Sequence, residues 1–275
     1  MRKAFTLIEM VVSLGILAVI LSFAGVIFRV SIDSQRMAMA NAEVMQKLRV
    51  ITEQLDADFR GGAIPTRLPY GYPVHISHST QAPAAAGTPV QMDSDAILLF
   101  TAGDFRSTEQ YGGNTIAGNV ACVYYGQPDP NSYKQPPQPH EKVLLRRQTI
   151  LAIGGPAQGS DPLGEFFTRS PQEWLVNPPI DPNGWMRRPV IEPNNVKASL
   201  PMFVAQGVDS FTLHYLDAST QLRTGAIPWV RPTGASSGVS AGINPKAFKF
   251  TFTLYDSKGI LKKGRTFTHI VVWDN

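Results

Sequence analysis

The stretch from residue 5 to residue 28, F-T-L-I-E-M-V-V-S-L-G-I-L-A-V-I-L-S-F-A-G-V-I-F, decides the fold of this 275-residue chain. An α-helix needs roughly 20 apolar residues to cross the hydrocarbon core of a bilayer, so this run of 24 can span it with modest tilt. Glu9 is its one formal charge, close to the start. A carboxylate in such a segment is costly and is usually partnered and functional, so Glu9 is a candidate site residue.

Past the apolar run the helical pattern continues. Ala38, Met45, Leu48, Leu55 and Phe59 recur at spacings of three, four and seven, which is the period of one helical face. The sequence therefore predicts that this apolar stripe carries a folded domain, while the first half of the same helix crosses a membrane.

The end of the helix is marked by Gly61-Gly62, which predict a left-handed C-cap, and Pro65 is the first proline of the chain. One helix of about 56 residues is expected from residue 5 to residue 60, far longer than the average of about 12 in globular proteins.

The remaining residues, 61–275, show a β pattern. Strands are expected at residues 96–100, 120–125, 143–150, 248–254 and 266–273, with turn chemistry at residues 256–259. In the fourth of these, F-K-F-T-F-T-L, apolar and polar residues alternate, which is typical of an antiparallel sheet with one buried face. The predicted class is α+β: a long N-terminal helix packed on an antiparallel sheet.

The N-terminus resembles a known family. The sequence Arg2-Lys3-Ala4 followed by F-T-L-I-E-M-V-V-S-L-G-I-L is similar to the class III signal of type IV pilins and type II secretion pseudopilins. Ala4 stands where that family usually has glycine. The resemblance implies that residues 1–4 are a leader, that a prepilin peptidase/methyltransferase cuts between Ala4 and Phe5 and methylates Phe5, and that Glu9 pairs with the N-terminal amine of a neighbouring subunit during assembly.

The downstream layout resembles the J-type minor pseudopilins of type II secretion and the PilW-like minor pilins. The residues that carry this are V-L-L-R-R at 143–147, the stretch F-V-A-Q-G-V-D-S-F-T-L-H-Y-L-D at 203–217, Trp229, and P-K-A-F-K-F at 245–250. The resemblance implies a place at or near a filament tip. Implied partners are other minor and major pilins or pseudopilins, the inner-membrane assembly platform and membrane lipid. It also implies a single-pass protein with a cytoplasmic N-terminus and a periplasmic or surface domain.

Three other interpretations stay open. Ser22-Phe23-Ala24 before Gly25 is typical of a conventional secretory signal, which would make the chain a secreted β-rich protein. The run can also be a plain anchor without assembly. A DNA-binding minor pilin is the third, because cations gather near the C-terminus at Lys246, Lys249, Lys258, Lys262, Lys263 and Arg265. Lysines on a strand's wet face more often discourage aggregation, so a nucleic-acid partner is not expected.

Proline gathers in residues 61–95 and 127–202, and because proline removes a backbone donor, these stretches are expected to be long surface loops. Trp174 and Trp185 lie in the second. They are expected either to pin the loop onto the sheet or to contact a partner.

Catalytic and metal-binding signals are scarce. Cys122 is the single cysteine and is predicted to be a buried thiol. His75-x-x-His78 has no third ligand at zinc-like spacing, and the acidic stretches at residues 93–95 and 181–184 are predicted to be turns and not calcium loops. No phosphate-binding, hydrolase or metalloprotease signature is present. Neither an enzyme nor a cofactor is therefore expected.

Overall fold

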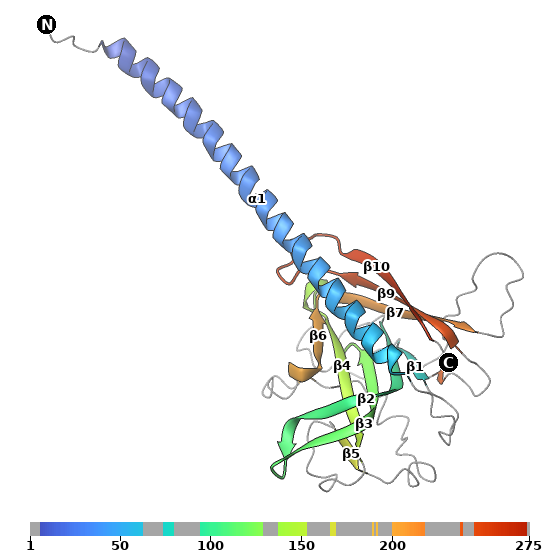
Figure 1. Ribbon diagram of the computed structural model, residues 1–275. Coiled ribbons are helices and arrows are strands. Elements are labelled where there is room, and N and C mark those ends of the chain that lie inside the picture. The colour runs from blue at the N-terminus through green and yellow to red at the C-terminus, as the bar shows by residue number, and fades with distance from the viewer. Residues whose placement is uncertain are drawn as a thin grey trace, which may run out of the picture.

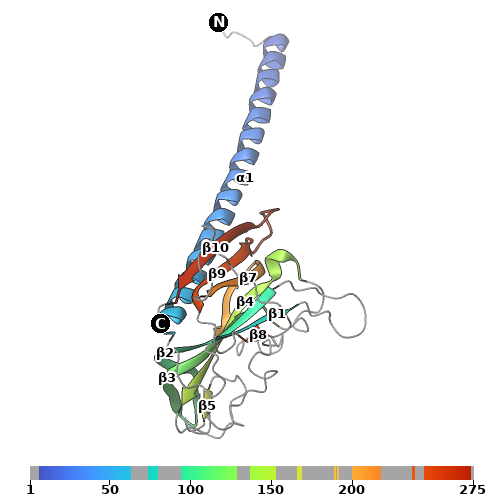
Figure 2. The ribbon, with the colours of Figure 1, turned by 90° about the vertical axis from the view of Figure 1, so that its right-hand side faces the viewer.

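The computed structural model describes residues 6–62, 74–79, 94–128, 137–152, 166–168, 189, 191, 200–217, 237–238 and 245–273. These residues form a long helix and a curled β-sheet (Figure 1). The C-terminal half of the helix lies against the sheet, and its N-terminal half projects away from it (Figures 1 and 2). The predicted α+β class is confirmed.

Helix α1 runs unbroken from Leu7 to Arg60, 54 residues. Its start is capped by Thr6, whose backbone is extended and whose side-chain oxygen accepts the N–H of Glu9. No proline interrupts it, and Ser13 and Ser22 donate their hydroxyls to the carbonyls of Glu9 and Ala18 one turn earlier. These two hydroxyls are therefore satisfied within the helix, which suits an apolar segment.

The end of α1 differs from the predicted left-handed cap. Gly61 has φ −77° and ψ −3°, which is right-handed backbone. A Cβ at Gly61 would lie 2.3 Å from the carbonyl oxygen of Ala102 and from the Thr101 hydroxyl, and the Gly61 carbonyl accepts the N–H of Ala102 at 2.6 Å. The glycine is required for close approach to the sheet and not for a positive φ.

The sheet contains ten strands in the described part of the chain. They are β1 (Val74–Ser79), β2 (Ser94–Tyr111), β3 (Asn114–Gly126), β4 (Val143–Ala152), β5 (Phe166–Thr168), β6 (Phe203–Gln206), β7 (Val208–Asp217), β8 (Ser237–Gly238), β9 (Pro245–Leu254) and β10 (Arg265–Val272). Short 3₁₀ turns occur at Pro139–Glu141 and Leu200–Met202. The order is β10-β9-β7-β2-β3-β4-β5, with β1, β6 and β8 off this path.

The sheet is mixed, although the sequence predicted antiparallel pairing. Most pairs are antiparallel, but β2 pairs in parallel with β7 through Ser94 and Phe211, and β4 pairs in parallel with β5. At the break at Gly207, whose φ is +81°, the chain passes from β6, which pairs with β4, to β7, which pairs with β9. β7 meets the first residue of β2, Ser94, in the same direction as β2.

The main core lies between α1 and one face of the sheet. Alternate residues of β2 and β3, such as Leu99 and Val123, face the helix, and their neighbours Leu98 and Cys122 belong to a second cluster on the opposite face. Cys122 is 2% exposed, which confirms the predicted buried thiol, and burial raises the pKa of this thiol far above its usual range.

The helical stripe that packs on the sheet is partly different from the predicted one. Leu55 and Phe59 are buried as expected, but Ala38 and Met45 are exposed. The residues that complete the buried face are Ala40, Val44, Ile51 and Asp58. Because apolar residues occur on more than one face of α1, the period alone does not identify the face that meets the sheet.

The proline-rich stretches are not wholly loop. Strand β1 lies within the stretch 61–95 and β5 within 127–202, and each pairs with a central strand. Residues 94–95, predicted as part of a turn, begin β2, where the buried Asp95 accepts the N–H of Leu213 at 2.7 Å. Trp174, Trp185, Trp229 and the acidic stretch 181–184 lie outside the described residues, as do the side chains of His75 and His78.

Candidate functional site

The N-terminal half of α1 is not covered by any other described part of the chain. Its most apolar 18-residue window has a mean hydropathy of 2.7 and is 0% buried. Every large apolar side chain between Leu7 and Val30 is at least 50% exposed. Water does not stabilise such a surface, so this half of the helix requires lipid or another protein around it. Among the described helices, α1 is the one long and apolar enough to cross a membrane.

Glu9, the site residue predicted from the sequence, lies in the first turn of this exposed half. The backbone N–H and the hydroxyl of Thr6 both donate to Glu9 Oε2, at 3.0 and 2.8 Å, and the Thr6 hydroxyl accepts the N–H of Glu9 at 3.4 Å. Together these contacts form a capping box, which satisfies the first donors of the helix. Ala4 and Phe5, the predicted processing residues, lie outside the described part of the chain.

The opposite end of α1 is attached to the sheet by a buried ion pair that sequence reasoning missed. Asp58, 4% exposed, receives two hydrogen bonds from Arg146 on β4: Nε to Oδ2 and Nη2 to Oδ1, each 2.7 Å. The Tyr125 hydroxyl also donates to Asp58. Burial, together with the charge of Asp58, raises the pKa of Tyr125 well above its usual value, and Asp58 outweighs burial to raise the pKa of Arg146. The guanidinium therefore stays charged at neutral pH.

Aromatic packing surrounds this ion pair at the end of the helix. The ring of Phe59 lies 5.2 Å from Phe248, 5.5 Å from Phe250 and 5.3 Å from Trp273, measured between centroids, with tilted or edge-on geometry. Such arrangements are favourable beyond the area that they bury. A hydrogen bond also joins Asp56 to His269 on β10, with 2.8 Å between Oδ1 and Nε2.

The middle of α1 contacts the loop between β9 and β10. Lys47 donates to the carbonyl of Tyr255 at 2.9 Å and pairs with Glu43 at 2.7 Å, and Glu43 accepts the N–H of Ser257 at 2.8 Å. Partial burial alone would raise the pKa of Glu43, but the hydrogen bonds from Lys47 and Ser257 outweigh it and lower the pKa. The carboxylate is thus charged where it holds the loop.

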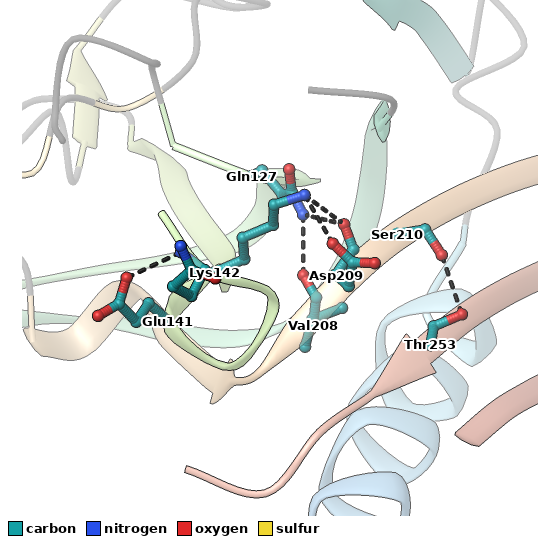
Figure 3. Close-up of polar contacts among 8 residues, drawn as sticks. Gln127, Glu141, Lys142, Val208, Asp209, Ser210 and Thr253 are labelled. Carbon is teal, nitrogen blue, oxygen red and sulfur yellow. Dashed lines mark hydrogen bonds and ion pairs between the residues drawn. The ribbon is translucent and has the colours of Figure 1, made fainter. Parts of the chain in front are cut away.

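A polar cluster beside this contact joins the ends of three strands (Figure 3). Lys142, just before β4, donates to the Asp209 carboxylate at 2.6 Å. The buried Gln127 amide, just after β3, donates to the carbonyls of Val208 and Asp209 at 2.8 and 3.0 Å. The N–H groups of Gly207 and Val208 donate to the Lys142 carbonyl, so this cluster fixes the break between β6 and β7.

Metal and nucleophile chemistry gain no support from the described residues. No group of three or more His, Cys, Asp or Glu side chains in the described ranges could hold a metal ion. The geometry instead indicates a structural role. The N-terminal half of α1 is an exposed apolar helix with Glu9 near its start, and its C-terminal end is held on the sheet by a buried ion pair and aromatic packing. The signals for the docked end were Asp58, an acid on the apolar face of the helix, and the charged pair Arg146-Arg147 within a strand.

Comparison with known proteins supports the predicted pilin-like motif at the N-terminus. Residues 1–25 match the family model described as "Prokaryotic N-terminal methylation motif". No curated protein matches the chain. Among solved structures, the type IV-like pilin TTHA1219 from Thermus thermophilus is similar, with 10% identity, a TM-score of 0.31, and coverage of 83% of this chain and 92% of that one. The matched motif supports the resemblance to the type IV pilin superfamily, and together with the exposed apolar helix it fits a membrane-anchored pilin or pseudopilin.

Proposed function

We propose that this chain is a minor pseudopilin or minor pilin of a bacterial type II secretion or type IV pilus system. It is made as an inner-membrane precursor with a cytoplasmic N-terminus, is cut between Ala4 and Phe5 by a prepilin peptidase, is methylated at Phe5 and assembles at or near a filament tip. The observation that carries the proposal is the uncovered apolar half of α1, which lies within and beyond the matched methylation motif.

The exposed half of α1 has the surface that such a subunit needs in two environments. In the membrane its apolar side chains face lipid. After assembly the helices of neighbouring subunits replace the lipid. Gly15 and Gly25 have no atoms within 4 Å of a hypothetical Cβ, so both positions are open to close approach by another helix.

We propose that Glu9 sets the register between the helices of adjacent subunits. Both hydrogen bonds from Thr6 use Oε2, and within the described residues Oε1 has no hydrogen-bond partner. The N-terminal amine of Phe5 on an adjacent subunit supplies the missing partner. A charge pair in a low-dielectric interior is favourable only when both members are present, so a wrong register leaves one charge unpaired.

The state of the N-terminus tests the processing step. The full chain is produced in a host with a prepilin peptidase, extracted from the membrane, and examined by N-terminal sequencing and intact mass. A start at N-methylated Phe5 is expected. A start at Gly25 would assign a conventional secretory signal, and retention of Met1 would leave a plain anchor; either result contradicts the proposal.

The role of Glu9 is tested by Glu9→Val. We expect the variant to remain in the membrane fraction but to enter filaments less than the wild type, because the amine of the neighbour loses its partner. Incorporation is measured as the ratio of subunit in sheared filaments to subunit in membranes. Glu53→Val is the matched control, since Glu53 is an exposed acid on the docked half of the same helix. Equal incorporation of Glu9→Val and wild type would contradict the role.

A further inference from the structure

A basic surface lies on the end of the sheet domain from which the N-terminal half of α1 departs. The loop between β9 and β10 and the start of β10 carry Lys258, Lys262, Lys263 and Arg265, all exposed. Residues 258–265 contain no acid. Their four positive charges equal the net charge of +4 of the whole chain, so the rest of the protein carries as many negative as positive charges. This segment therefore combines four cations with no acid.

The loop is held rigidly toward the helix. Asp256 is fully buried, and its carboxylate accepts the N–H groups of Lys258, Ile260 and Leu261 at 3.2, 2.9 and 2.8 Å. Glu43 and Lys47 bind the preceding backbone, as described above. Figure 1 shows this loop at the edge of the domain nearest the projecting half of α1. The cations are therefore presented from a fixed position.

The helix extends the basic surface toward the N-terminus. Arg29, Arg36 and Glu43 are spaced by seven residues, which is close to two helical turns, so the two exposed arginines lie on the helical face that holds the loop. Asp33 is the one acid between the two arginines. We define the basic strip as Arg29, Arg36 and the four cations of the loop.

We propose that the basic strip is attracted to anionic phospholipid headgroups of the membrane in which α1 is anchored and thereby sets the direction in which the helix tilts. This rests on the proposed membrane anchoring. About 20 residues from Leu7 cross the hydrocarbon, which brings Arg29 to the headgroups. Glu43 lies 14 residues further, about 21 Å along the helix axis.

The height of the loop above the headgroups determines how strongly the membrane attracts it. The electrostatic screening length is about 8 Å at physiological salt, so an upright helix keeps the loop beyond most of the surface potential. Membrane helices tilt by about 20° on average. A tilt toward the strip lowers the loop toward the lipid, and a tilt away raises it. In neutral lipid the basic strip favours neither tilt direction, whereas anionic lipid favours a tilt toward the strip.

Two variants, each with one introduced cysteine, measure the tilt direction. Met45 is 51% exposed and lies two residues from Glu43, on the opposite helical face at nearly the same height. Ser257→Cys and Met45→Cys are labelled separately with a donor dye, while the buried Cys122 is not expected to react. The full-length protein is reconstituted in nanodiscs with acceptor dye on a fraction of the headgroups, in phosphatidylcholine alone or mixed with phosphatidylglycerol.

The expected result is that phosphatidylglycerol raises energy transfer at Ser257→Cys and lowers it at Met45→Cys. This effect of phosphatidylglycerol on energy transfer is lost at 1 M salt, where the screening length is about 3 Å. It is also lost in the double variant Lys262→Glu/Lys263→Glu. The control Arg49→Glu/Arg106→Glu makes the same change in net charge at positions 78% and 70% exposed that lie outside the strip, and it keeps the difference.

Each contrary outcome has a distinct meaning. Stable integration in both lipids, with transfer that is independent of lipid charge, overturns the strip proposal alone. Loss of integration in both lipids overturns the anchoring and this inference with it. Duplex DNA that binds the strip and restores the phosphatidylcholine transfer values would assign the strip to nucleic acid instead.

Discussion

The two halves of α1 both carry apolar side chains but have opposite surroundings. Between Leu7 and Val30 the large apolar side chains are at least half exposed, whereas Val44, Ile51 and Leu55 are fully buried against the sheet. The halves also differ in charge, since the docked half places Glu43, Lys47, Asp56 and Asp58 against specific partners on the sheet domain. Apolar periodicity therefore identifies the helix, and embedded charged residues identify the half that is docked within its own chain.

The buried ion pair gives the largest expected effect on this comparison. Arg146→Ala leaves Asp58 as an uncompensated buried charge, which should lower the free energy of unfolding by about 3–5 kcal/mol. We would measure it by denaturant unfolding of the full chain in detergent, followed by tryptophan fluorescence. The control Arg49→Ala removes an exposed pair on the same helix, with side chains 78% and 62% exposed, and should lower the free energy of unfolding much less. Equal effects of the two variants would contradict the assigned role of the buried pair.

The contrast between glycines in the two halves gives an intermediate effect. Gly61→Ala places a Cβ 2.3 Å from the Ala102 carbonyl oxygen, which requires the helix end to shift and should cost about 1–3 kcal/mol. Gly25→Ala meets no atom within 4 Å, so the unfolding of the domain should be unchanged. The same denaturation experiment measures both variants, and a stability loss for Gly25→Ala that matches that of Gly61→Ala would show that the projecting half is not free.

The smallest expected effect is a local response of the β9–β10 loop to acid. Burial alone would raise the pKa of Asp256, but the backbone N–H groups of Leu261, Ile260 and Lys258 outweigh it and lower the pKa. A carboxyl with a lowered folded-state pKa contributes stability above its unfolded pKa, about 3.9, and loses it as the pH falls through the lowered value. Hydrogen exchange at Ile260 and Leu261 should therefore accelerate in acid relative to the rest of β9 and β10.

Asp256→Asn is the control for this acid response. The variant should exchange faster at neutral pH and lose the extra acceleration in acid, because no charge remains to be neutralised. Unchanged exchange in the variant would mean that the carboxylate does not hold the loop.

Much of the fold follows from local signals. The unbroken apolar run, the absence of proline before Pro65 and the pair Gly61-Gly62 predicted the long helix, and alternation in residues 248–254 predicted the strand that became β9. The parallel pair of β2 with β7 was missed because it depends on where the chain goes after Gly207. Strand β1 was missed because neighbouring prolines outweighed the alternation of Val74 and Ile76 with polar residues.

The candidate site was predicted only in part, for a physical reason. Glu9 stands out because a lone charge in an apolar run is expensive in any fold. Asp58 and Arg146 are ordinary surface residue types, and their pairing depends on contact between residues 88 positions apart. Such a contact becomes visible only when the helix and the sheet are placed together.

The continuity of α1 gives the molecule a mechanical property. A helix of 54 residues is about 80 Å long, and this one has no proline and no interruption between its exposed tip and its docked end. Because Asp58, Phe59 and Gly61 clamp that end to the sheet, a twist or pull applied near Glu9 is transmitted to the domain as rigid rotation or translation instead of being absorbed at a joint. The exposed half of α1 and the sheet domain are therefore expected to move together as one rigid unit.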